Sequence, residues 1–145
     1  MSDEFLYFQD LKIGDEFGPS VYQLTQKTIT KYVEAVEDTS PMYVDSKQAK
    51  ALGFESAVAP PAIAAIFFMD AVGKAFPNRP PGGIHSKQLF NFISAPKPGD
   101  ILLTKLKIVD KYLKKAMKYV IIEGGTERQD GTLICLGRLT VIWSQ

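Results

Sequence analysis

The chain has 145 residues, 46% of them hydrophobic and 23% charged, which is typical of one globular domain and not of a disordered chain. Its 17 Lys and Arg side chains nearly balance its 16 Asp and Glu side chains, so neither nucleic acid nor an anionic membrane is expected as the main partner. One cysteine and one histidine exclude an internal disulfide and a metal site built from several such ligands. We therefore expect a single domain over residues 1–145 that has no metal and no cofactor.

Targeting signals are not evident in the sequence. The first five residues, Met-Ser-Asp-Glu-Phe, do not form the basic and then apolar start of a secretory signal. The longest apolar stretch, residues 57–69, contains two prolines and is shorter than the roughly 20 residues that a membrane-spanning helix needs. A cytoplasmic protein without a membrane span is the expectation.

Helical signals dominate the first half of the chain. A short strand is expected at residues 21–24, after which the Thr25 hydroxyl can cap a helix. That helix should end near Asp38, and its apolar face is formed by residues at helical spacing: Ile29, Tyr32, Val33 and Val36. Pro41 interrupts the chain, and a shorter helix follows from Asp45 to Gly53.

The most apolar segment of the chain predicts a central helix from Pro61 to Ala75. Proline suits the first turn of a helix because its missing N–H has no partner there in any case. Apolar residues surround most of the circumference, so we expect other elements to cover this helix on nearly all sides.

Beyond Gly83 the hydrophobic period changes to two residues, which predicts strands. The turns between them are expected at 114–115 and 129–131. The alternating positions that indicate strands are Gln88, Phe90 and Phe92; Leu102, Thr104, Leu106 and Ile108; Met117, Tyr119 and Ile121; and Leu133, Cys135, Leu139, Val141 and Trp143.

One buried helix followed by antiparallel strands predicts an α+β domain in which the sheet wraps the helix. Such a sheet has open edges, and pairing two domains edge to edge would cover one edge of each. A dimer is therefore expected.

Three segments of the chain, residues 37–45, Gly53-Phe54 and residues 58–62, form a recognisable pattern together with residues 7–17, 82–88 and 98–100. In these segments the chain resembles the MaoC-like dehydratases, the (R)-specific enoyl-CoA hydratase and 3-hydroxyacyl dehydratase branch of the hotdog fold. The resemblance covers nearly the whole chain, and it implies a hotdog fold that pairs as a double hotdog. It also implies an acyl-CoA or acyl-carrier thioester as the substrate.

The catalytic signature of that family is D-x-N-P-x-H, followed by a His-Gly at the start of the central helix. In the family the Asp and His activate one water, and the Gly amide stabilises the developing enolate oxygen. By resemblance, Asp38 and Pro41 of this chain match the signature, and Ser40 replaces the Asn. Tyr43 replaces the His and, with an ordinary pKa of about 10 against about 6.5 for histidine, is a poor base at neutral pH.

The His-Gly at the helix start is replaced by Pro60-Pro61, and proline has no N–H to offer an oxyanion. The departures resemble the partner subunits of heteromeric dehydratases, which lack the signature and shape the acyl tunnel. We therefore expect a subunit of an enoyl-CoA hydratase or 3-hydroxyacyl-thioester dehydratase complex without a complete active site, paired with a second MaoC-like hotdog subunit. By the same resemblance, Ser40, Pro61, Ala62 and Phe67 are the expected substrate-binding residues.

An alternative is a homodimeric hydratase that uses Asp38 as the base and Tyr43 as a hydrogen-bond donor. A third reading is a stand-alone thioester binder or thioesterase, for which Asp70 is the only candidate carboxylate on the central helix. Whether the chain is an enzyme by itself is left open at this point.

Structural roles compete with functional ones at each candidate. Asp38 could simply form an Asx-type turn, and Tyr43 and Phe67 could be packing residues. His85 could enter a site across a dimer or have a plain structural role. Cys135 alternates with apolar residues and is interpreted as a buried core thiol.

Overall fold

The computed structural model of the protein describes residues 4–144. One antiparallel sheet has the strand order β1-β3-β4-β5-β2. Its strands are β1 (Glu16–Gln23), β2 (Ile84–Phe92), β3 (Ile101–Lys114), β4 (Met117–Arg128) and β5 (Leu133–Trp143). The helices are α1 (Gln26–Ala35), α2 (Ser46–Ala51) and α3 (Ala64–Ala75), with 3-10 turns at Phe8–Asp10, Pro41–Tyr43 and Pro61–Ile63.

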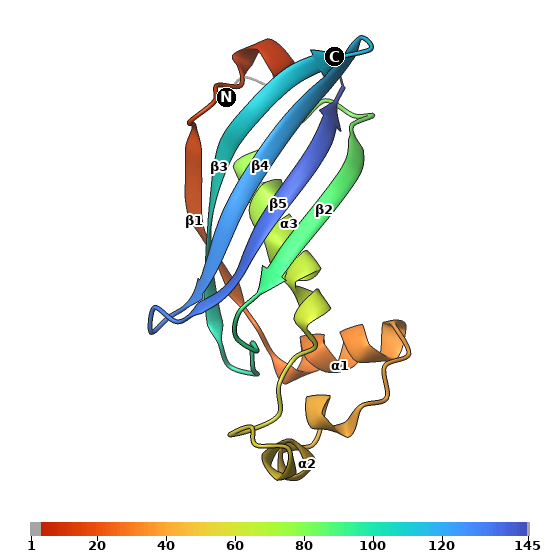
Figure 1. Ribbon diagram of the computed structural model, residues 1–145, viewed down its shortest axis with the longest axis vertical. Coiled ribbons are helices and arrows are strands. Elements are labelled where there is room, and N and C mark those ends of the chain that lie inside the picture. Colours follow the sequence, from red (N-terminus) through yellow and green to blue (C-terminus); the bar gives the residue numbers. More distant parts are fainter. Residues whose placement is uncertain (1–3, 145) are drawn as a thin grey trace.

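The sheet curves around α3, while α1 and α2 lie beyond one end of the sheet and both chain ends lie at the other (Figure 1). The α+β hotdog prediction is therefore confirmed. The predicted alternation is also confirmed in β3, where Leu102, Thr104, Leu106 and Ile108 are buried and Lys105 and Lys107 are exposed. This alternation places one face of the sheet on α3 and the other in solvent.

Two glycines allow α3 to approach the sheet closely. Gly124 of β4 and Gly137 of β5 are register partners, and the Phe68 ring of α3 lies against both. A Cβ atom at Gly137 would lie 2.5 Å from Cε2 of Phe68, and one at Gly124 would lie 2.9 Å from the same atom. Because these two residues have no side chain, the Phe68 ring of α3 packs directly against the backbone of the sheet.

The central helix differs from the prediction in two respects. Its first residues, Pro61–Ile63, form a 3-10 turn, and the α-helix begins only at Ala64. Phe67 and Phe68 are buried as expected, but Ile66 is 40% exposed, so the expectation that α3 is covered on nearly all sides is wrong for one side. The reason is that the sheet covers one face of the helix and leaves the opposite face open (Figure 1).

Strands β1 and β2 form the two edges of the sheet. The β2 edge is flanked by exposed apolar side chains, among them Ile84 at 55%, Leu89 at 55%, Phe92 at 46% and Ile93 at 49%. An exposed edge strand with apolar neighbours is a ready template for pairing with another chain. Among the described residues, no helix is long and apolar enough to cross a membrane.

Candidate functional site

Asp38 is presented by the C-terminal end of α1. The Thr25 side chain caps the start of this helix by accepting from the Thr28 amide, as predicted. The helix ends earlier than expected, at Ala35, in a Schellman arrangement in which the Asp38 amide donates to the Val33 carbonyl at 2.9 Å. Glu37 occupies the left-handed position of this motif with φ 56°, where glycine is usual. Glu37 therefore turns the chain at the end of the helix, and Asp38 is the next residue after this turn.

The Asp38 carboxylate takes part in a local turn. Its Oδ1 accepts a hydrogen bond from the Ser40 amide at 3.1 Å, which is the Asx-type turn that the sequence offered as the structural interpretation. Ser40 then precedes the 3-10 turn Pro41–Tyr43. The signature segment is thus a compact bend, and one hydrogen bond from the backbone of that bend holds the carboxylate.

Tyr43 lies in the apolar core beneath this bend. It is 7% exposed, belongs to a buried cluster that includes Val33, Ile63 and Phe67, and is held by Gln26, whose Nε2 donates to the Tyr43 carbonyl at 3.0 Å. Burial and the negative charge of Asp38 both raise the pKa of the Tyr43 phenol above its ordinary value. The phenol therefore stays protonated at neutral pH and can donate a hydrogen bond but cannot act as a base.

A hollow of about 450 Å³ opens at Asp38. Thr30, Val33 and Val44 form part of its wall, and the acidic residues Glu34, Glu37 and Asp38 also line it. A lining with three acidic residues and no basic one disfavours an anionic group such as a phosphate. The hollow suits a neutral, partly apolar group.

The start of α3 offers few hydrogen-bond donors. Neither Pro60 nor Pro61 has an N–H, and the Ile63 amide donates to the Pro60 carbonyl at 3.0 Å in the 3-10 turn. Ala62, which is exposed, is the first residue of this turn with an N–H. The oxyanion donor that the family has at position 61 is therefore missing from the backbone itself.

A second hollow, of about 210 Å³, lies beside the start of α3. Two of the predicted substrate-binding residues, Pro61 and Phe67, line it together with Phe92, Ile93 and Cys135. Burial raises the pKa of the Cys135 thiol, while a hydrogen bond with Thr126 lowers it by less. The thiol is therefore protonated and inert at neutral pH, and the hollow can hold an apolar chain. We call it the apolar cavity below.

The predicted site residues thus fall on two sides of one buried cluster. Asp38 and Ser40 line the first hollow, while Pro61 and Phe67 line the apolar cavity. Tyr43 and Phe67 belong to the cluster between them, which also contains Val33 from the first hollow and Cys135 from the second. Among residues 4–144, no group of three or more His, Cys, Asp or Glu side chains is placed to hold a metal ion.

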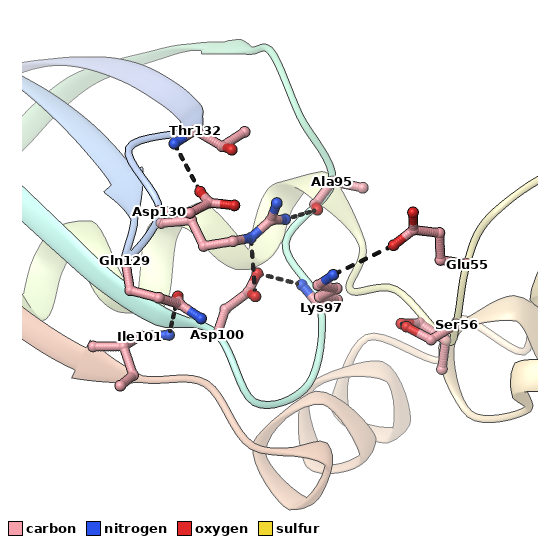
Figure 2. A network of polar contacts seen from close by, with 11 residues as sticks. Glu55, Ser56, Ala95, Lys97, Asp100, Ile101, Gln129, Asp130 and Thr132 are labelled. Carbon is pink, nitrogen blue, oxygen red and sulfur yellow. Dashed lines mark hydrogen bonds and ion pairs between the residues drawn. The ribbon is translucent and has the colours of Figure 1, made fainter.

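A buried ion pair that was not predicted joins Arg128 to Asp100, which lies within the network of polar contacts in Figure 2. Nε of Arg128 lies 2.9 Å from Oδ1 of Asp100, whose side chain is 1% exposed. Arg128 Nη2 also donates to the Ala95 carbonyl at 3.0 Å, and the Lys97 amide donates to Oδ2 of Asp100 at 2.9 Å. The network joins the loop after β2 to the end of β4. This loop contributes Ser94, Ala95 and Pro96 to the cavity wall.

Comparison with known proteins agrees with this geometry. Residues 12–136 match the family described as FAS1-like, dehydratase domain region. The chain belongs to this family, and the predicted MaoC-like resemblance is confirmed. A UPF0336 protein of Saccharopolyspora erythraea is 26% identical over 137 residues, which are 90% of this chain and 87% of the relative.

Two solved structures show the same fold. The R-hydratase PhaJ1 from Pseudomonas aeruginosa has a TM-score of 0.82 and 19% identity, with 96% of this chain and 86% of that chain covered. The HadBC (3R-hydroxyacyl-ACP dehydratase) complex from Mycobacterium tuberculosis has a TM-score of 0.81 and 20% identity, with 90% and 96% covered. The same fold therefore occurs both in an R-hydratase and in a dehydratase complex.

Proposed function

We propose that this protein is a MaoC-like hotdog subunit of an enoyl-thioester hydratase or 3-hydroxyacyl-thioester dehydratase. On this proposal it lacks a complete active site of its own and contributes an acyl-binding surface to a pair of hotdog subunits. The observation that carries it is the start of α3, where Pro60 and Pro61 remove the N–H and the histidine that the family uses. The loss of one oxyanion donor alone typically lowers the rate by about 10²–10³.

Tyr43 adds a second, independent deficit. Because burial and Asp38 raise the pKa of its phenol, Tyr43 cannot take a proton from water at neutral pH as a histidine would. The free β2 edge and its exposed apolar side chains support pairing with another hotdog subunit. The structurally similar HadBC (3R-hydroxyacyl-ACP dehydratase) of Mycobacterium tuberculosis is itself a complex.

The experiment compares the purified chain with the chain co-expressed with the product of an adjacent gene. Hydration of crotonyl-CoA is followed through the loss of its ultraviolet absorbance. We expect no hydration by the chain alone, and hydration by the pair when the partner carries the full Asp/His signature. Robust turnover by the isolated chain would refute the proposal.

The electrostatic coupling of Asp38 and Tyr43 favours a second candidate, a homodimeric hydratase. In this case Asp38 would accept a proton from water while the water oxygen bonds to C3 of the enoyl thioester, and the same proton would pass to C2. The protonated phenol of Tyr43 would hold the water or the thioester by a hydrogen bond. Asp38→Asn keeps an acceptor for the Ser40 amide and should abolish turnover, while Tyr43→Phe should reduce it; unchanged rates in both variants would exclude this candidate.

A further inference from the structure

Gly125 of β4 lies opposite Lys105 of β3 on the face of the sheet that is turned away from α3, which we call the outer face. A Cβ atom at Gly125 would meet only a methyl group of Leu136 at 3.5 Å, which is an ordinary contact, and its φ is not positive. Its neighbour Gly124 differs, because Phe68 occupies the place of its Cβ atom. Glycine inside a strand weakens the strand and often marks the close approach of another molecule. Nothing within the single chain requires glycine at position 125.

Gly125 lines a hollow of about 990 Å³ on the outer face. In register, Gly125 lies between Lys105 of β3 and Leu136 of β5, and the Gly18-Pro19 bulge of β1 lies beside Lys105 on its other side. Lys105, Leu136 and Pro19 are all exposed. The hollow therefore combines protruding side chains with a bare stretch of backbone on which another side chain fits.

A row of alternating charges crosses the outer face one pleat away from Gly125. In register order from β1 to β5 its members are Glu16, Lys107, Glu123 and Arg138. Ion pairs join Lys107 to Glu16 and Arg138 to Glu123 within the chain. All four side chains line the hollow and are between 45% and 74% exposed, so each can also interact with a charge above the sheet.

This row is complementary to itself when it is reversed, because its four signs alternate. A two-fold axis that runs along the strands, between β3 and β4, reverses the row and places a second copy face to face with the first. Lys107 of each copy then faces Glu123 of the other, and Glu16 faces Arg138. An axis across the strands would instead place each charge opposite its own copy, which is repulsive. The charges thus favour one arrangement of two copies over the other.

The same axis matches the shapes of the two faces. It places Lys105 of each copy over the bare backbone of Gly125 in the other, and the apolar Leu136 over Pro19. Packed sheets lie about 10 Å apart and cross at about 30°. The outermost charged pair lies about 7 Å from the axis, so this crossing displaces its two members by only about 4 Å, which side chains of their length can span.

We propose that the outer face of the sheet binds the outer face of a second copy of this chain about this axis. The contact leaves both edges of the sheet free and does not depend on the proposed function. Exposed charges and few apolar side chains form it, so we expect a weak pair with a dissociation constant of about 10–100 µM. At about 1 µM the outer face is then unoccupied.

The variant Gly125→Thr tests the close approach. Threonine favours strands and its side chain would occupy the hollow, so the variant should unfold in urea at no lower concentration than the wild type while it loses the face contact. Sedimentation gives the mass at about 1 µM and at about 200 µM. We expect the mass of the wild type to double between the two and that of Gly125→Thr to stay constant. A variant that doubles in mass like the wild type would overturn the inference.

Charge reversal tests the axis. Lys107→Glu and Glu123→Lys each create two repulsive pairs between copies, so neither variant should associate alone. An equimolar mixture of the two should double in mass again, because every facing pair is then opposite in sign. Glu55→Lys is the matched control and should associate like the wild type, because Glu55 is 91% exposed and does not line the hollow.

Two outcomes of the charge reversal would overturn the inference. One is association of either variant alone, and the other is a mixture that does not associate. A wild-type chain whose mass is the same at both concentrations and that pairs only with a different hotdog subunit would also overturn it. That last result would leave the proposed function intact.

Discussion

Replacing Arg128 by Met tests whether the buried ion pair holds the wall of the apolar cavity. Arg128 is 13% exposed and Asp100 is 1% exposed at the side chain, so water cannot replace the guanidinium when it is removed. The change leaves the Asp100 carboxylate with the Lys97 amide and removes the hydrogen bond from Arg128 to the Ala95 carbonyl. Removing one partner of a buried pair costs about 3–5 kcal/mol, and we expect the free energy of unfolding to fall by that amount.

The matched control is Lys107→Met. Lys107 lies 3.7 Å from Glu16 in a pair whose side chains are 52% and 74% exposed. Solvent screens such a pair, and its loss should change the free energy of unfolding by no more than about 1 kcal/mol. Both variants introduce the same residue in place of a cation, so hydrophobicity and charge change alike.

The assay is urea unfolding followed by circular dichroism at one fixed protein concentration, because association would make stability depend on concentration. We expect the midpoint of Arg128→Met to lie well below that of the wild type, with an unchanged slope. The double variant Asp100→Leu/Arg128→Met should recover part of the loss because it leaves no buried charge. If Arg128→Met is no less stable than Lys107→Met, the reasoning is refuted.

Three further predictions concern the packing of α3 and the Asp38 bend. Gly137→Ala should lower the free energy of unfolding by about 1–3 kcal/mol, because its Cβ would lie 2.5 Å from Phe68, and Phe68→Leu in the same chain should restore part of it in urea titrations. Glu37→Gly should raise stability by up to about 1 kcal/mol in the same assay, since φ 56° suits glycine; a loss would show that the Glu37 side chain has another role. In a titration followed at 295 nm, one phenol of the wild type should ionise above pH 10, and its signal should be absent from the Tyr43→Phe variant. The Asp38→Asn variant should lower the pKa of this phenol. Because folding raises that pKa, its contribution to stability is present below pH 10 and is lost as pH rises through the folded value.

The parts of the fold that were predicted are those that depend on local pattern. The alternation of Leu102, Thr104 and Leu106 follows from one face of a strand meeting the core, and Thr25 caps α1 through a bond three residues away. Such signals lie within a few residues of one another. The same is true of the Asx turn at Asp38, which sequence reasoning offered as one of two readings.

What was not predicted depends on residues far apart in the chain. Asp100 directly precedes β3 and Arg128 is the last residue of β4, so the two residues are far apart in the sequence. The residues next to either of them in the sequence do not indicate that they form an ion pair. The register shift after His85 leaves no local signal such as a glycine in that strand, and it decides which face the imidazole occupies. Glu37 in a left-handed conformation contradicts the usual preference for glycine at a local cost of about 1–2 kcal/mol, and the hydrogen bonds that close the helix end, from the Glu37 amide to the Glu34 carbonyl and from the Asp38 amide to the Val33 carbonyl, accompany it.

The start of α3 is the feature on which the proposed need for a second subunit rests. A histidine at position 43 would replace the missing imidazole, but a side chain cannot restore the N–H that Pro61 lacks. Pro60 is extended at ψ 140°, and its carbonyl already accepts from the Ile63 amide, which is therefore not available to an oxyanion. The deficit is thus part of the main chain, while the apolar cavity lies beside it. A fold that keeps the cavity, loses the donor and leaves an apolar strand edge free is suited to share a site across that edge.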